Sequence, residues 1–96
     1  MFPTLQITLR NVPQSDELDK VIRQHADRLQ HLDHRLVSCR VAVERVGHQG
    51  QQFTVRIDLE TPAGEIIADR QHNEDARAAV RDAFEAARRQ LDDGGR

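Results

Sequence analysis

The sequence predicts an α+β fold in the order β-α-β-β-β-α, with a four-stranded mixed sheet and both helices packed on one face. Short segments alternate apolar and polar residues, two longer segments repeat apolar residues every three or four positions, and the last three strands follow one another through short connections. A chain of 96 residues can close one hydrophobic core of two layers, so we expect a single domain over residues 1–96.

The first strand and the first helix are expected in the N-terminal third of the chain. Leu5, Ile7 and Leu9 alternate with polar residues, which is the period of a half-buried strand. Ser15 is expected to cap a helix that runs to about residue 32, with acidic residues in its first turn. The apolar residues that share one face of this helix are Leu18, Val21, Ile22, Leu29 and Leu32.

The middle of the chain predicts a hairpin. Its two strands have as inward residues Val37, Cys39, Val41 and Val43, then Phe53, Val55, Ile57 and Leu59. After the turn TPAG, the segment EIIAD is expected to form a fourth, shorter strand, whose inward residues are left open because Ile66 and Ile67 are adjacent.

The last helix is expected after residue 73, with Asn73 as its cap. Its buried stripe is predicted to be Ala76, Val80, Ala83, Phe84, Ala87 and Leu91. The ending DDGGR, at about residues 92–96, is expected to be a frayed tail.

The connections predict how these elements pair. Short connections make the last three strands an antiparallel meander, while the first helix is a right-handed crossover that sets the first strand parallel to a neighbour. Because each helix has one apolar face, both helices must cover the same side of the sheet. The other side is left to water, as its polar residues indicate: Arg40, Glu44, Arg56, Asp58 and Glu60.

Composition restricts the classes of function. With 31% charged and 38% hydrophobic residues, the chain is typical of soluble globular domains, and no membrane association is expected. The start MFPTLQITLR lacks the pattern of a signal peptide, and the single Cys39 cannot form an internal disulfide, so we expect a cytoplasmic protein. The net charge of -2 argues against nucleic-acid binding through overall charge, so any basic function must be local.

No catalytic residue, metal site or cofactor is expected. The two serines look like a helix cap and a solvent-facing strand residue, and Cys39 points inward without an adjacent histidine. His31 and His34 lack the spacing and partners of a zinc site, and the glycines fit no nucleotide-binding fingerprint. His25 is expected to be a partly buried, hydrogen-bonded histidine. We therefore expect neither enzymatic activity nor a small-molecule substrate.

Arginines of the last helix form the main functional candidate. At 100° per residue, Arg77, Arg81 and Arg88 lie within roughly 40° of one another, and Arg89 is next to them. This ridge has two interpretations: it holds the backbone phosphates of folded RNA, or it is a solvated face whose charge is balanced by ion pairs. The acidic residues at suitable spacings for such pairs are Glu74, Glu85 and Asp92.

Two long segments resemble a known family. In ITLRNVPQSDELDKVIRQHADRLQHLDHRLVSCRVAVE, a strand ends in Arg10-Asn11 and a helix with a Leu-rich end leads to a second strand. In GEIIADRQHNEDARAAVRDAFEAARRQL, a strand leads to a helix with the core step Ala78-Ala79-Val80 and the ending Arg89-Gln90-Leu91. These segments are similar to the opening and the closing of ribosome hibernation promoting factors and ribosome-associated translation inhibitors, in the short form.

This resemblance implies the same fold, which is related to double-stranded-RNA-binding domains. It also implies a translation inhibitor that binds the small ribosomal subunit and its rRNA, and that silences idle ribosomes by occluding the mRNA and tRNA sites. Carried over by position, the residues implied in rRNA binding are Lys20, Arg23, Arg28, Arg77, Arg81, Arg88 and Arg89.

A second hypothesis comes from departures from the family pattern. The family usually has an aromatic residue where Arg77 stands, an acidic residue at Arg81 and a lysine-rich segment in place of LDDGGR. The alternative is a divergent member that has lost rRNA binding and acts as a protein-interaction module. Its acidic tail and mixed-sign helices would permit a protein partner or self-association.

Overall fold

The computed structural model describes residues 4–47, 52–73 and 75–94. The elements follow the predicted β-α-β-β-β-α order, which is confirmed. Their bounds are β1 Leu5–Arg10, α1 Asp16–Leu32, β2 Ser38–Val46, β3 Gln52–Thr61, β4 Gly64–Asn73 and α2 Ala76–Gly94.

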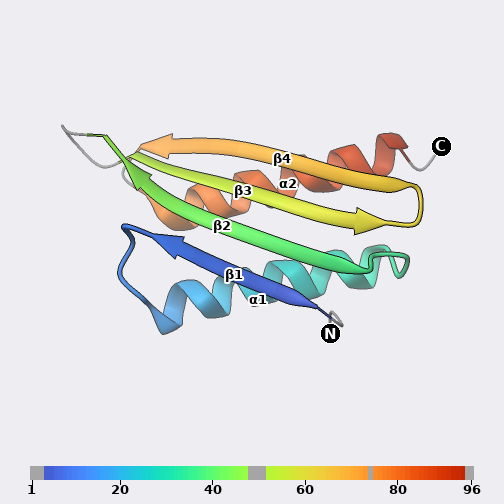
Figure 1. The fold of residues 1–96 in the computed structure, drawn as a ribbon, viewed down its shortest axis with the longest axis horizontal. Helices are drawn as coiled ribbons and strands as arrows, with labels where there is room; N and C mark the ends of the chain where they lie inside the picture. The colour runs from blue at the N-terminus through green and yellow to red at the C-terminus, as the bar shows by residue number, and fades with distance from the viewer. Residues whose placement is uncertain (1–3, 48–51, 74, 95–96) are drawn as a thin grey trace.

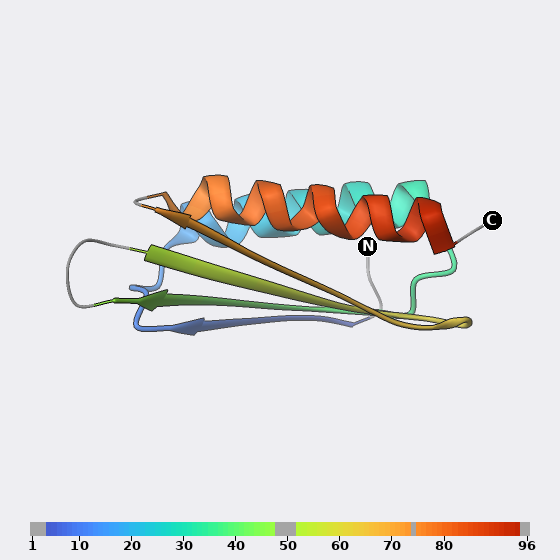
Figure 2. The same cartoon turned by 90° about the horizontal axis from the view of Figure 1, so that it is seen from above.

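The strands form one sheet in the order β1-β2-β3-β4 (Figure 1). β1 runs parallel to β2, whereas β2 and β3, and then β3 and β4, are antiparallel. Parallel strands need a crossover connection, and α1 provides it between β1 and β2. Figure 2 shows α1 and α2 on the same side of the sheet, and Figure 1 shows that both helices run in the same direction. The predicted mixed sheet with one covered face is therefore confirmed.

The hydrophobic core lies between the sheet and the helices. Because side chains alternate along a strand, one face of the sheet is buried while the other stays polar. The strand residues with the least exposure are Cys39, Val41, Val43, Val55, Ile57, Leu59 and Ala68. The structure also shows which of the two adjacent isoleucines in β4 points inward. Ile66 packs against the core, and Ile67 is 38% exposed.

Two predicted core residues are exposed. Val37 is 47% exposed because β2 begins only at Ser38, and Leu36 takes the buried position instead. Leu32 is 56% exposed, since at 100° per residue it lies about 60° round the helix from the buried Leu29. Both residues stand at the end of an element, where periodicity is least informative.

The helix N-termini are capped by side chains. Ser15 caps α1 as predicted, since its Oγ accepts the N–H of Leu18 at 3.2 Å. The prediction of Asn73 as the cap of α2 is wrong, because this residue pairs with Gln52 at the end of β4. The cap is Asp75, whose Oδ1 accepts the N–H groups of the second and third helical residues at 3.0 and 3.2 Å.

Two elements are longer than predicted. β4 has ten residues instead of five, because β3 offers partners from Thr61 through to Gln52. α2 continues through Asp92 and Asp93 to Gly94, beyond the expected end at Leu91. Within the predicted tail, residues 95 and 96 lie outside the described part of the chain.

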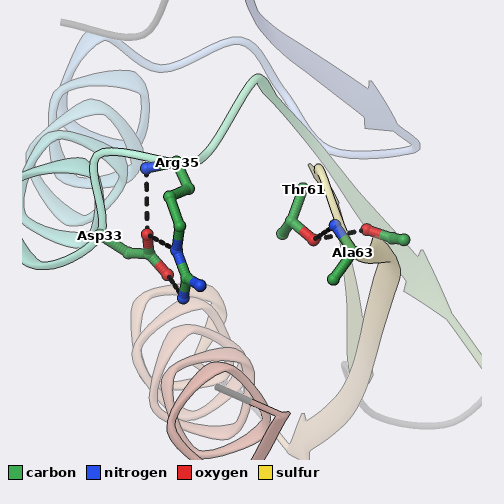
Figure 3. Close-up of polar contacts among 5 residues, drawn as sticks. Asp33, Arg35, Thr61 and Ala63 are labelled. Carbon is green, nitrogen blue, oxygen red and sulfur yellow. Dashed lines mark hydrogen bonds and ion pairs between the residues drawn. The ribbon is translucent and has the colours of Figure 1, made fainter. Parts of the chain in front are cut away.

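Two local motifs hold the end of the molecule where α1 leads to β2 and β3 turns into β4 (Figure 3). In the α1 to β2 connection, the guanidinium of Arg35 donates to both carboxylate oxygens of Asp33, each at 2.9 Å. In the turn, Thr61 Oγ1 accepts the N–H of Ala63 at 3.1 Å and donates to the Gly64 carbonyl oxygen at 2.9 Å. Gly64 has a φ of 135°, which side-chain-bearing residues rarely adopt.

Candidate functional site

A groove of about 250 Å³ lies between α1 and α2. Four positions on each helix line it, and in both helices they are spaced by three, four and seven residues, so that each set shares one helical face. We call this feature the helix groove. Its lining consists of His25, Arg28, Leu29 and Leu32 from α1, and Arg81, Phe84, Glu85 and Arg88 from α2.

Two contacts set the register of the helices that form the helix groove. Near their N-termini, Arg77 of α2 donates a hydrogen bond to the Glu17 carboxylate of α1, 60 positions away in the chain. Further along, the rings of His25 and Phe84 stack with their centroids 5.2 Å apart. Arg28 and Arg88 are separated by nearly the same number of positions in the sequence as Glu17 and Arg77, and as His25 and Phe84. In parallel helices this common register brings Arg28 level with Arg88.

The helix groove carries an excess of positive charge. Its lining has three guanidinium groups and one carboxylate, that of Glu85, a net of two positive charges in a chain whose formal charge is -2. Among the described residues, neither Arg28 nor Arg88 has an ion-pair partner, and Arg81 reaches only its neighbour Asp82 at 3.4 Å. Three guanidinium groups against one carboxylate leave an excess of positive charge, so the helix groove favours an anion.

The floor of the helix groove is apolar. Leu29 and Phe84 are each 4% exposed, and His25 is half-buried against the Phe84 ring. Burial lowers the pKa of His25, the charges of Arg28 and Arg81 lower it further, and Glu85 opposes them. The predicted partial burial of His25 is confirmed, but in the described part of the chain its contact is this ring and not a hydrogen bond.

The other arginines and the lysine of the predicted site lie elsewhere. Arg23 is paired with Asp19 at 2.8 Å and lines a separate hollow between α1 and β1. At 100° per residue it lies about 140° round α1 from Arg28. Lys20 and Arg89 are exposed and do not line the helix groove, and neither has an ion pair within the residues that the structure describes.

The predicted arginine ridge of α2 is therefore divided. Arg81 and Arg88 line the helix groove, while Arg77 is held at the N-terminal end by Glu17, a partner on the other helix that residue spacing within α2 does not predict. Of the acids expected to balance the ridge, Glu85 lines the helix groove, and the structure records no ion pair for it or for Asp92. Glu74 lies outside the described residues.

Sequence reasoning missed the meeting of Arg28 with Arg81 and Arg88, and the stacking of His25 on Phe84. One signal was available in the sequence. In each helix an aromatic or imidazole residue is followed three or four positions later by an arginine, His25 by Arg28 in α1 and Phe84 by Arg88 in α2, so each helix carries such a pair on one face.

Two further features bear on the classes of function. No group of three or more metal-ligating side chains occurs in the described segments, and none of their helices is long and apolar enough to span a membrane. Cys39 is fully buried, and this burial raises the pKa of its thiol to about 12, so the residue is an unreactive part of the core.

Comparison with known proteins identifies the family. Residues 5–93 match the family described as "Sigma 54 modulation protein / S30EA ribosomal protein". The chain belongs to this S30EA family. The resemblance noted from the sequence is thereby confirmed, and membership in the S30EA family supports the expectation that the protein is not an enzyme. No curated protein sequence gives a significant match.

Solved structures share the S30EA fold of this chain. One is described as a ribosomal subunit interface protein from Coxiella burnetii, with a TM-score of 0.83, 16% identity, and coverage of 96% of this chain and 97% of that one. Another is the N-terminal domain of Protein Y from Thermus thermophilus, with a TM-score of 0.75, 20% identity, and coverage of 94% and 93%. At these identities the likeness establishes the fold.

Proposed function

We propose that this protein binds the small ribosomal subunit in the cytoplasm and inhibits translation by occupying the sites of mRNA and tRNA. The helix groove is the observation that carries the proposal. It gathers three arginines, two of them without an ion pair among the described residues, into a positive site in a chain that is negative overall. Membership in the S30EA family, described as a ribosomal protein family, and the name of one structure with the same fold, a ribosomal subunit interface protein, support the ribosome as the partner.

Arginine suits this role because its planar guanidinium donates two parallel hydrogen bonds to a phosphate. Contacts to phosphates fix the position of a protein on RNA without reading its sequence. A bound domain with dimensions of 42 × 24 × 16 Å would then exclude other ligands by its volume, with no chemical step. Outside the helix groove, the remaining candidate contacts are Lys20, Arg23, Arg77 and Arg89.

Co-sedimentation with purified small subunits at low and moderate salt tests the binding. The charge-reversed variant Arg28→Glu/Arg81→Glu/Arg88→Glu should lose binding, and wild-type binding should weaken as salt rises. A matched control reverses three arginines on the uncovered face of the sheet, Arg10→Glu/Arg40→Glu/Arg56→Glu, and should sediment with the subunits. No sedimentation of the wild type at low salt would contradict ribosome binding and favour the protein-interaction alternative.

Occlusion needs a separate measurement. Small subunits are loaded with labelled mRNA and initiator tRNA, and the retained label is measured as the protein is added. If the protein occupies these sites, retention should fall as the protein saturates the subunits. Simultaneous binding of all three would contradict occlusion while leaving ribosome binding intact.

A further inference from the structure

We infer that the helix groove holds the phosphodiester backbone of one RNA strand, with Arg28 and Arg88 on its two walls and His25 on its floor, and that protonation of His25 tightens this hold. The inference rests on the proposed function. It narrows the contact on the ribosome to a strand backbone and adds a dependence on pH.

The walls favour a strand over a single phosphate ion. Arg28 and Arg88 come level across the helix groove in the register that the Glu17 and Arg77 contact sets. Arg81 stands two turns before Arg88, and at 1.5 Å per residue this separates their Cα atoms by about 10 Å along the axis of α2. Cations spread along a groove in this way can contact more than one phosphate of the same chain.

The floor favours the backbone over the bases. A base-stacking site needs an aromatic face open to the ligand. Phe84 is 4% exposed and its ring is already stacked on His25, at an interplanar angle of 15°. The chain has no Trp or Tyr to provide another such face. The apolar floor does have an electrostatic effect, because it excludes water and so strengthens the attraction between guanidinium and phosphate.

His25 makes this site responsive to pH. The charged groups around it are Arg28 on its own helix and Arg81, Glu85 and Arg88 on α2. Without a ligand, the arginines and burial disfavour the imidazolium form, and Glu85 alone favours it. A phosphate in the helix groove reverses this balance because it offsets the guanidinium charges. Protonation then raises the net charge of the lining from two to three.

Binding and protonation are therefore coupled. A ligand that favours the protonated form raises the pKa of His25, and by the same coupling a lower pH raises the affinity for the ligand. The affinity increases by about tenfold for each unit by which bound RNA raises the pKa of His25. Affinity should therefore increase as the pH falls through and below 6.5, the ordinary value for histidine.

The pH dependence is measured as the Kd for small ribosomal subunits at several pH values between about 5.5 and 8, at constant salt. Wild-type protein should bind about threefold to tenfold more tightly at the acid end. His25→Gln should lose this difference. His31→Gln, which removes an exposed histidine that does not line the helix groove, should keep it. A pH dependence that survives in His25→Gln, or none in the wild type, would overturn the role of His25.

The groove itself is tested at one pH with Arg28→Gln/Arg88→Gln. This pair should bind subunits at least about tenfold more weakly and should reduce the slope of log affinity against log salt by roughly 1–2. The control Arg40→Gln/Arg56→Gln removes the same charge from the other face of the sheet and should change affinity less than about twofold. Equal losses of affinity in the two double variants would contradict RNA binding in the helix groove.

These outcomes separate the two proposals. If the wild type fails to bind subunits at any pH, the proposed function is wrong and the inference falls with it. If the wild type binds but Arg28→Gln/Arg88→Gln has the same affinity as Arg40→Gln/Arg56→Gln, the inference about the helix groove is wrong and the proposed function stands. Displacement of the protein from subunits by polyglutamate but not by poly(U) would assign the helix groove to an acidic protein segment, which would also overturn it.

Discussion

His25 lies flat against Phe84, with the ring centroids 5.2 Å apart and the ring planes inclined by 15°. This pair joins the two parallel helices in the middle of the helix groove, where the imidazole is held against an apolar surface and beside arginines. A histidine in such surroundings is disfavoured in its charged form. The contact therefore links the packing of the helices to the charge of the site.

The first prediction is that stability falls with acid through His25. Burial, followed by the nearby Arg28, holds the folded pKa of His25 below 6.5, so the unfolded chain binds the proton more readily. Stability from this group is present above 6.5 and is lost as the pH falls through the lower folded value. NMR titration of the His25 ring gives the folded pKa, and urea unfolding across the same pH range gives the slope. In His25→Gln the part of the pH dependence of the unfolding free energy that His25 contributes should vanish. An unchanged pH dependence would contradict its assignment to His25.

The second prediction concerns the contact between Glu17 and Arg77. Their side chains are 68% and 61% exposed, so water and salt screen the ion pair. Glu17→Gln should lower the free energy of unfolding by less than about 1 kcal/mol at low salt, with a smaller effect at high salt. Urea denaturation at two salt concentrations measures both values. A loss above about 2 kcal/mol would mean that this pair does more than join two exposed helix ends.

The third prediction separates the two residues that compete as caps of α2. Asp75 accepts two backbone N–H groups in the first turn, so Asp75→Ala should cost about 1 kcal/mol of stability. Asn73→Ala, at the end of β4, serves as the control and should cost less. If chemical denaturation ranked the two substitutions in the opposite order, the position of the helix start would be wrong.

The fourth prediction is that Cys39 does not react in the folded protein. Its side chain has no exposed surface, and burial raises the pKa of the thiol to about 12. A disulfide reagent at pH 8 should label it at the rate of unfolding, and at once in urea. Rapid labelling without denaturant would show that the strand β2 is less well covered than the structure indicates.

The fold could be predicted from the sequence because its signals are local. Alternation in Leu5 to Arg10 and the repeats around Ile22 and Val80 each specify one element, and a crossover helix between strands implies a parallel pair. Errors arose where a shift of one or two residues matters. Leu36 is buried in place of Val37 because the strand begins one residue later than predicted. Asp75 caps α2 in place of Asn73, and both residue types are good caps.

The site could be predicted only in part. The flank shared by Arg81 and Arg88 follows from the 100° turn per residue within one helix. Their meeting with Arg28 depends on the register between two helices, which is set by packing contacts such as His25 on Phe84. A pattern read along a single helix contains no information about its neighbour, so the helix groove could not be derived from it.

The uncovered face of the sheet has a consequence for anything that later approaches a bound ribosome. With the helix groove against RNA, this face would be turned outward. Opposite charges alternate on it: Arg40 and Asp58 pair across neighbouring strands at 3.8 Å, and Arg56 stands opposite Asp69. The protein would thus replace a patch of polyanionic surface by a coat of mixed charge. Cationic ligands that find the ribosome by long-range attraction would then lose that guidance over the whole area the domain covers.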